Sequence, residues 1–243
     1  MPSFTETLKV DEQDMTLYMS LPSGSGPSPA VVVIQHLGGV DTFVRTMVDR
    51  LAEAGYAAAA PDLYHRLGED MEPAMRRQQL RDPEIITDLN ATVDFLRHHP
   101  EVDRECLGIT GFCMGGRVVY LMAANNPHFR AAVAYYGGNI MVPWGEGVEA
   151  PFARTGELGC PLMFHFGEED SNPSQDDMRK LGAELTRYGK EHEFHTYPDA
   201  GHAFMDFTNP QRYQEAAAMA SWPRTLDFFA RHLSTSSELP QNQ

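Results

Sequence analysis

Residues 106–116 read CLGITGFCMGG, and this stretch sets the expectation for the fold. Residues 106–111 form a short apolar run, which is typical of a strand buried on both faces of a parallel sheet. Residues 114–124 place apolar side chains at helical spacing. Between them the chain must turn so tightly that larger neighbours would collide, and glycines flank Cys113 there. The stretch therefore predicts a strand, a sharp turn that carries Cys113, and a helix.

The same alternation continues in both directions along the chain. Further strands are expected at 30–35, 56–60, 131–136, 162–166 and 193–197, and further helices at 43–54, 84–98, 175–188 and 211–232, the last one kinked by Pro223. Residues 3–10 and 15–20 predict an antiparallel hairpin. The pattern indicates one α/β domain over residues 1–233, a doubly wound and mostly parallel sheet with helices on both faces. A polar, frayed tail is expected at 234–243.

The overall charge excludes some classes of partner. The chain has 34 Asp and Glu against 19 Lys and Arg, a formal charge of −15, and such a surface repels nucleic acid and anionic membranes. No signal peptide or membrane-spanning run is visible. Three cysteines cannot all pair within the chain, which favours a reducing, cytoplasmic compartment. We expect a monomer or small homo-oligomer that binds a small molecule.

Cys113 is the strongest candidate for a catalytic residue. The segment Gly111–Gly116 matches the pattern glycine-x-nucleophile-x-glycine, with Cys in place of the usual Ser. A helix N-terminus directly after Cys113 favours a thiolate, and the N–H of Met114 is expected to stabilise an oxyanion. Cys106 and Cys160 lack this context and are expected to be small core residues.

A base and an acid are expected in later loops. His202 lies in the segment DAGHAF after the last strand, where Phe204 can anchor the loop. The preceding strand is followed by GEEDSNP, residues 167–173, and Asp170 is favoured as the partner of His202 because the loop must turn before the side chain can reach back. Glu168 is the alternative. His165 lies inside an apolar strand and is expected to be a core residue.

No motif indicates a metal or a cofactor. The sequence contains no H-E-x-x-H, G-x-G-x-x-G or Walker loop. His192 and His195 fall on one strand at a spacing that points them to opposite faces. We therefore expect neither a metal nor a cofactor.

Together these segments resemble the dienelactone hydrolase family over about residues 30–233. The resemblance rests on VVVIQHLGGV, YAAAAPDLYHR, GFCMGGR, AYYGG, HFGEED and DAGHAF, in this order. It implies an α/β-hydrolase fold, a triad of Cys113, His202 and Asp170, and hydrolysis of a carboxylic ester or lactone.

Two positions depart from the family pattern. His36 stands where family enzymes carry a Glu that helps to activate the cysteine, so His36 either favours the thiolate or only shapes the oxyanion loop. The N–H of Leu37 is the implied second oxyanion donor. Asp206 stands where dienelactone hydrolases proper have an Arg that binds the substrate carboxylate. We therefore expect neutral esters or lactones to be preferred, with anionic dienelactones as the alternative.

The pocket walls and a second carboxylate-binding arginine are less sharply defined. The arginine falls in the segment that contains Arg76, Arg77 and Arg81, which does not align clearly. His65 is a candidate wall residue, and the segment 139–159 is long enough to be functional. The residues expected to contact substrate are His36, Tyr64, Tyr136, Trp144, Phe204 and Asp206, although Trp144 fits ordinary packing equally well.

Two non-hydrolytic functions compete with this interpretation. An exposed, reactive Cys113 could act as a redox sensor, and the chain could be an inactive scaffold on a hydrolase fold. A sensor has no need of Asp170 and His202, and activity on a simple aryl ester separates both alternatives from a hydrolase.

Overall fold

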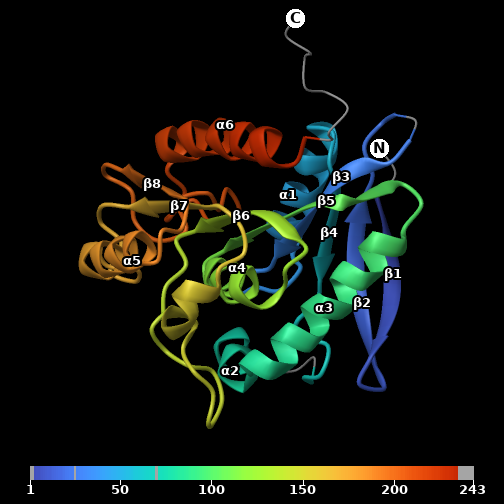
Figure 1. Cartoon of the computed structure of the whole chain (residues 1–243), viewed down its shortest axis with the longest axis horizontal. Coiled ribbons are helices and arrows are strands. Elements are labelled where there is room, and N and C mark those ends of the chain that lie inside the picture. The colour runs from blue at the N-terminus through green and yellow to red at the C-terminus, as the bar shows by residue number, and fades with distance from the viewer. Residues whose placement is uncertain (1–2, 25, 69–70, 235–243) are drawn as a thin grey trace, which may run out of the picture.

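The computed structural model describes residues 3–24, 26–68 and 71–234, and one eight-stranded sheet runs through them (Figure 1). The strand order is β1-β2-β4-β3-β5-β6-β7-β8. The bounds are β1 Ser3–Val10, β2 Gln13–Ser20, β3 Ser28–Ile34, β4 Ala57–Pro61, β5 Val102–Phe112, β6 Phe129–Tyr135, β7 Leu162–Gly167 and β8 His192–Tyr197.

The pairing of the strands confirms the expected topology. Strands β3 to β8 pair in parallel, whereas β1 and β2 form the predicted antiparallel hairpin and β2 joins β4 antiparallel. The hairpin turn is tighter than expected: Asp11 and Glu12 both take positive φ, so β2 already begins at Gln13. Parallel pairing puts the carboxyl ends of β5, β6, β7 and β8 at one edge of the sheet, where ligands bind in such folds.

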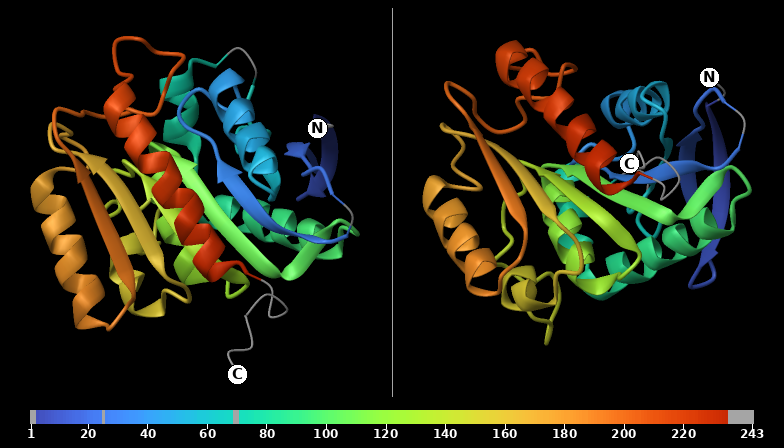
Figure 2. Two further views of the ribbon diagram at one scale, coloured as in Figure 1. Left: turned by 90° about the horizontal axis from the view of Figure 1, so that it is seen from above. Right: turned by 45° about the horizontal axis from the view of Figure 1, so that its top comes forward.

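Helices cover both faces of the sheet, as Figure 2 shows. Helices α1 and α6 pack on one face, and α3, α4 and α5 on the other, so each face has its own apolar core. The helices are α1 Thr42–Glu53, α2 Pro73–Gln79, α3 Asp82–His98, α4 Met114–Asn125, α5 Gln175–Arg187 and α6 Glu215–His232. Asp41 caps α1 by accepting the N–H of Val44, and Gly55 follows the helix at φ +97°.

Two short helical segments and the start of α6 differ most from the expectation. Helix α2 and a 3₁₀ segment at Pro151–Glu157 were not predicted, because each is only seven residues long and lacks a full amphipathic period. Helix α6 begins at Glu215 instead of residue 211, since the chain before it forms successive turns back to Asp206. The helix continues through Pro223, and the expected kink there stays a prediction.

Several single-residue expectations are confirmed. Cys106 and Cys160 are buried. His165 is fully buried, and its two ring nitrogens contact the hydroxyls of Tyr197 and Thr225. Burial keeps the pKa of His165 well below its usual value, so the ring is neutral.

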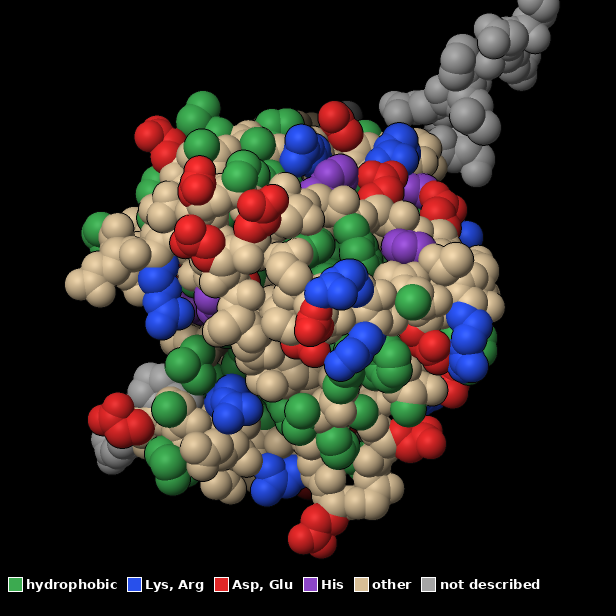
Figure 3. Space-filling view, turned by 90° about the vertical axis from the view of Figure 1, so that its left-hand side faces the viewer, with side chains coloured by type: hydrophobic (Ala, Val, Ile, Leu, Met, Phe, Trp, Pro, Cys, Tyr) green, Lys and Arg blue, Asp and Glu red, His purple; other side chains and the backbone are tan. Residues whose placement is uncertain are grey.

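The described surface is mixed in character. Acidic and basic side chains alternate with apolar ones on the face drawn in Figure 3, despite the net charge of −15. Among the described helices, none is long and apolar enough to cross a membrane. Of the expected tail, residues 235–243 lie outside the described part of the chain.

Candidate active site

Cys113 occupies a strained turn between β5 and α4. Its φ and ψ are 56° and −120°, a region that a residue with a side chain rarely adopts and that costs about 1–3 kcal/mol. The turn leaves no room beside it: a Cβ on Gly111 would lie 2.5 Å from the Gly115 carbonyl oxygen, and a Cβ on Gly115 would lie 2.5 Å from the Ile34 carbonyl oxygen. These glycines let β5, α4 and β3 approach closely enough for the Cys113 side chain to project at the edge of the sheet.

The loops that carry His202 and Asp170 are joined to each other by their backbones. The N–H of Glu169 donates to the Ala200 carbonyl at 2.9 Å, and the N–H of Glu168 donates to the Tyr197 carbonyl at 2.9 Å. Gly167 permits this approach, because a Cβ there would lie 2.0 Å from the Ala200 carbonyl oxygen. Two loops more than 30 residues apart in the sequence are thereby held as one unit.

Cys113, His202 and Asp170 form a continuous hydrogen-bonded chain. The Nε2 atom of His202 lies 3.0 Å from the Cys113 Sγ, and its Nδ1 atom lies 2.9 Å from the Asp170 Oδ2. The Asp170 side chain is 1% exposed, and its other oxygen accepts the N–H of Asn172 at 2.8 Å. The alternative acid, Glu168, is exposed. The geometry is that of a nucleophile, a base and the group that orients the base.

The charge on His202 follows from its two neighbours. Burial alone would lower the pKa of His202, but hydrogen bonds and charges from Asp170 and Cys113 outweigh burial and raise it to about 10. This raised pKa favours the imidazolium form of the ring next to the sulfur. An adjacent positive charge at a helix N-terminus stabilises a thiolate.

His36 is held away from the thiol by an acidic partner that the sequence did not suggest. Its Nε2 atom lies 2.8 Å from the Oδ2 of Asp41, and its ring packs edge-on against Phe43. Within the described residues, no hydrogen bond or ring contact joins His36 to Cys113. These contacts favour the loop-shaping role of His36 over activation of Cys113. The signal available in the sequence was Asp41 itself, five residues on and directly before a helix.

The loop of residues 35–40, which contains the predicted oxyanion donor Leu37, is tied to the segment that follows β4. The side-chain oxygen of Gln35 accepts the N–H of Leu63 at 3.1 Å. The hydroxyl of Tyr64 donates to the Leu37 carbonyl at 3.1 Å and lies 3.4 Å from the Met114 sulfur. Tyr64 is 5% exposed. His65, a candidate wall residue, instead lies buried 3.1 Å from Asp88 of α3.

Tyr136 packs against the His202 imidazole, and Phe204 packs in turn against Tyr136. Both contacts are edge-on, with ring centroids 5.2 Å apart in the first and 5.1 Å apart in the second. Phe204 is fully buried, so it anchors the His202 loop, as expected, but offers no surface for the predicted substrate contact. Tyr136 is 1% exposed, and its hydroxyl has no hydrogen-bond partner in the described part of the structure.

Asp206 is a buried carboxylate close to these aromatic residues. It is 7% exposed and accepts hydrogen bonds from the N–H and the hydroxyl of Thr208. Asp206 also affects the pKa of Tyr136. Burial is the largest cause that raises this pKa well above its usual value, and the nearby groups of Cys113, Tyr135 and Asp206 raise it further. Asp206 is therefore buried near Tyr136 and does not project into bulk solvent.

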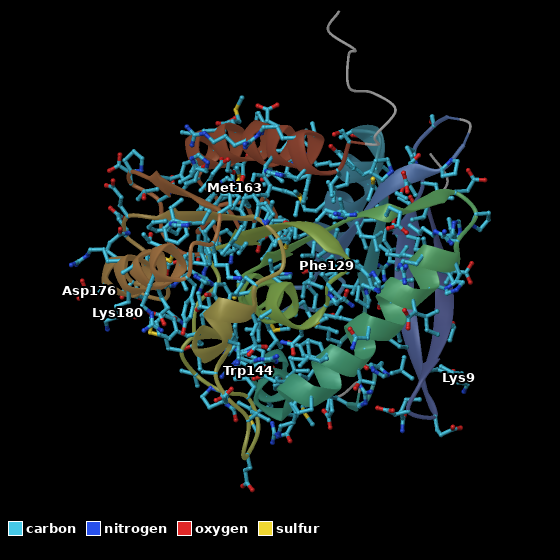
Figure 4. The ribbon with its side chains drawn as sticks, in the orientation of Figure 1. Lys9, Phe129, Trp144, Met163, Asp176 and Lys180 are labelled. Atoms are coloured by element: carbon cyan, nitrogen blue, oxygen red, sulfur yellow. The ribbon has the colours of Figure 1, made fainter. Side chains whose placement is uncertain are left out.

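Trp144 is a packing residue in this structure. Its ring lies on the guanidinium of Arg117 at 3.9 Å, and its backbone N–H donates to Asp82 at 2.9 Å. Arg117 and Asp82 form a fully buried bidentate pair, with N–O distances of 2.6 and 3.0 Å. Figure 4 places Trp144 inside the molecule, whereas Asp176 and Lys180 project outward from α5. Its contacts place Trp144 in the anchor of the segment 139–159, and not in the expected pocket wall.

The three candidate arginines separate in space. Arg76 and Arg77 of α2 lie over the rings of Tyr64 and Trp144, at 5.8 and 5.9 Å. Arg81 donates to the carbonyls of Gln78 and Leu80 and so closes the end of α2. Arg76 therefore lies next to Tyr64, whereas Arg77 lies next to the packing residue Trp144.

A polar cleft of about 480 Å³ opens beside the imidazole. It is lined by Glu169, Asp170, Ser171, Asn172, Gly201, His202, Gln211, Arg212 and Gln214. A smaller, mostly apolar cavity of about 110 Å³ lies behind Asn172, between the loop after β6 and helix α5. Among the described residues, no group of three or more His, Cys, Asp or Glu side chains is arranged to hold a metal ion.

Comparison with known proteins assigns the family. The family model of the dienelactone hydrolases matches residues 15–233. The chain belongs to the dienelactone hydrolase family. Its α/β-hydrolase fold is also that of a solved structure from Klebsiella pneumoniae titled "Putative Dienelactone Hydrolase", with a TM-score of 0.85, 31% identity, and coverage of 95% of this chain and 98% of the other.

Curated members of the dienelactone hydrolase family give the same result. A carboxymethylenebutenolidase from Rhodococcus opacus is 31% identical over 92% of this chain and 89% of its own length. A protein from Methylorubrum extorquens named "Putative carboxymethylenebutenolidase" is 32% identical over 93% of this chain and 80% of its own length. This dienelactone hydrolase family member is therefore a hydrolase.

Proposed function

We propose that this enzyme hydrolyses carboxylic esters or lactones with Cys113 as the nucleophile, His202 as the proton carrier and Asp170 as its orienting partner. The observation that carries the proposal is the position of the His202 ring, 3.0 Å from the Cys113 sulfur and 2.9 Å from a buried Asp170. The family of the chain supports the reaction class.

In the first half-reaction, the Cys113 thiolate attacks the substrate carbonyl carbon. A C–S bond forms, and the carbonyl electron pair moves to oxygen, where the N–H groups of Leu37 and Met114 receive the charge. Met114 opens α4, so its N–H has no partner within the helix. The intermediate collapses, the C–O bond breaks, and the His202 imidazolium gives its proton to the leaving alkoxide.

In the second half-reaction, water cleaves the thioester. The now neutral His202 takes a proton from water, hydroxide attacks the acyl carbon, and the C–S bond breaks. The carboxylic acid leaves, and the thiolate–imidazolium pair is restored. Asp170 keeps the Nδ1 proton of His202 in place throughout, so that Nε2 faces the reacting atoms.

We also propose that neutral substrates are favoured over carboxylate-bearing ones of the same size. The buried charge of Asp206 supports this preference, because it lies close to Tyr136 and hence to the catalytic imidazole. A substrate carboxylate would meet repulsion where the family pattern has an arginine. The positive charges of Arg76 and Arg77, which lie over Tyr64 and Trp144, would instead favour an anionic substrate. Anionic dienelactones are therefore the competing substrate class in the test.

A panel of neutral and anionic esters and lactones tests both parts of the proposal. It is assayed with the wild type, with Cys113→Ala, and with Cys106→Ala as a control that removes a buried thiol elsewhere. Loss of turnover in Cys113→Ala alone supports the nucleophile. A redox sensor on the same fold would show no turnover in the wild type with any ester or lactone.

A further inference from the structure

The hydroxyl of Tyr64 reaches both segments that are proposed to stabilise the oxyanion. It lies 3.1 Å from the Leu37 carbonyl oxygen and 3.4 Å from the Met114 sulfur. Leu37 follows β3, and Met114 follows β5, so the two segments come from different strands of the sheet. A single buried side chain therefore connects the two halves of the site.

Tyr64 itself is firmly placed. Its backbone N–H donates to Asp62 at 2.9 Å, and the preceding Leu63 N–H is held by Gln35 at 3.1 Å. Its ring lies against Gly39, where a Cβ would come within 3.6 Å of the ring, and the Arg76 guanidinium lies 5.8 Å from the ring centroid. These backbone and ring contacts restrict the direction in which the hydroxyl points.

The hydroxyl remains a hydrogen-bond donor over the working pH range. Burial, and then the nearby charge of Cys113, raise the pKa of Tyr64 well above its usual value. It therefore does not serve as a base for the thiol. Its contacts are with a carbonyl oxygen and a thioether, and neither of these groups takes part in proton transfer.

We propose that Tyr64 is a positioning residue that fixes the spacing of the oxyanion hole by linking the Leu37 segment to Met114. The inference rests on the proposed function, because it assumes that the N–H groups of Leu37 and Met114 receive the oxyanion. Donors of this kind act by being held in place before the charge develops, and a small displacement removes much of their effect. The loop 35–40 also contains His36, which is held by Asp41, and the Tyr64 hydroxyl reaches from Leu37 of this loop to Met114 of α4.

Tyr64→Phe keeps the ring and removes only the hydroxyl. We expect kcat for a neutral ester to fall about ten-fold with KM changed less than about two-fold, a smaller loss than the 10²–10³-fold typical of a deleted oxyanion donor. Affinity for a trifluoromethyl ketone analogue, whose adduct with a thiolate carries the same tetrahedral oxyanion, should fall by the same factor as kcat/KM. Alkylation of Cys113 by iodoacetamide needs no oxyanion hole, and its rate should stay at the wild-type value.

Tyr120→Phe is the matched control. Tyr120 is also a buried tyrosine, and its hydroxyl pairs with Thr155 at 2.6 Å, between α4 and the 3₁₀ segment. This variant should lose some thermal stability and keep kcat and ketone affinity.

The kinetics of Tyr64→Phe and Cys113→Ala separate the possible outcomes. A loss of kcat and ketone affinity in Tyr64→Phe with unchanged alkylation supports the proposal. Unchanged kcat, or a parallel loss of kcat and alkylation rate, overturns it. If Cys113→Ala is inactive while Tyr64→Phe retains full kcat, only the role of Tyr64 is wrong. If Cys113→Ala is fully active, the proposed function is wrong.

Discussion

The Oδ2 atom of Asp170 lies 2.9 Å from the Nδ1 atom of His202, and the carboxylate is buried below the imidazole. We predict that Asp170→Asn lowers kcat by about 10²–10⁴-fold, because an amide that donates to Nδ1 holds the wrong tautomer. Glu168→Gln is the control: it makes the same change at the exposed acid that the sequence left as the alternative. Steady-state kinetics of both variants on one ester decides between them, and a larger loss in Glu168→Gln would contradict the assignment of Asp170.

The raised pKa of His202 predicts a pH dependence. Hydrogen bonds and charges from Asp170 and Cys113 raise this pKa from 6.5 to about 10. The catalytic imidazolium should therefore persist at neutral pH, and kcat/KM should fall as the pH rises through about 10. Because the folded-state pKa is raised, the stabilisation of the folded state is fully present below about 6.5 and is lost as the pH rises through about 10.

Nuclear magnetic resonance titration of the histidines measures this directly. In Cys113→Ala the sulfur no longer supports the charge on the ring, so the pKa of His202 should fall relative to the wild type. His165, which is neutral and buried, should not titrate in either protein over the same range. A His202 resonance that titrates identically in both proteins would show that the thiol and the imidazole are not coupled.

The charge of Asp206 predicts a substrate preference. A favourable charge contact replaced by an unfavourable one changes the free energy by about 2–4 kcal/mol, so neutral esters should exceed matched anionic ones by roughly 30- to 1,000-fold in kcat/KM. Asp206→Asn should narrow that gap, because it removes the negative charge. The amide oxygen can still accept the Thr208 hydrogen bonds, so the local structure is kept. Asp176→Asn removes the same charge at an exposed position on α5 and should leave the gap unchanged. Faster turnover of the anionic member by the wild type would point to dienelactone-type substrates instead.

The buried pair of Arg117 and Asp82 predicts a large effect on stability. Asp82→Ala leaves a guanidinium with 0% side-chain exposure without its carboxylate, which typically costs about 3–5 kcal/mol. It also removes the acceptor of the Trp144 backbone N–H. Chemical denaturation should show the loss, with Glu157→Ala, an exposed partner of Arg154, as a control near zero. Equal effects of the two variants would mean that the buried pair does not anchor the segment 139–159.

Much of the fold was predictable because the central strands contain short apolar runs. Runs such as AVVVI and LGITG indicate burial on both faces, and the alternation with helices then restricts the topology. Cys113, His202 and Asp170 could be placed because each follows a strand at the same edge of the sheet. The short helix α2 and the 3₁₀ segment could not be predicted in this way. Each has only seven residues, too few for a clear amphipathic pattern, and helices this short depend on tertiary contacts for their stability.

The supporting residues of the site could not be predicted in the same way. The pairing of His36 with Asp41, the contact of Tyr64 with Leu37, and the burial of Arg117 on Asp82 depend on side-chain directions between separate elements. Trp144 illustrates the difficulty: a lone Trp in a long Gly- and Pro-rich segment fits a pocket wall and a packing anchor equally well. Only the position of Arg117 beneath its ring shows which one applies.

The measurement that tests the central claim most directly is the mass of the acyl-enzyme. The wild type is mixed with a slowly hydrolysed aryl ester, quenched in acid and digested, and the peptides are weighed. The account predicts an acyl group on the peptide that contains Cys113, bound as a thioester that neutral hydroxylamine removes, and no such adduct in Cys113→Ala. Steady turnover of the same ester by Cys113→Ala, or an acyl group that accumulates on a different residue, would contradict it.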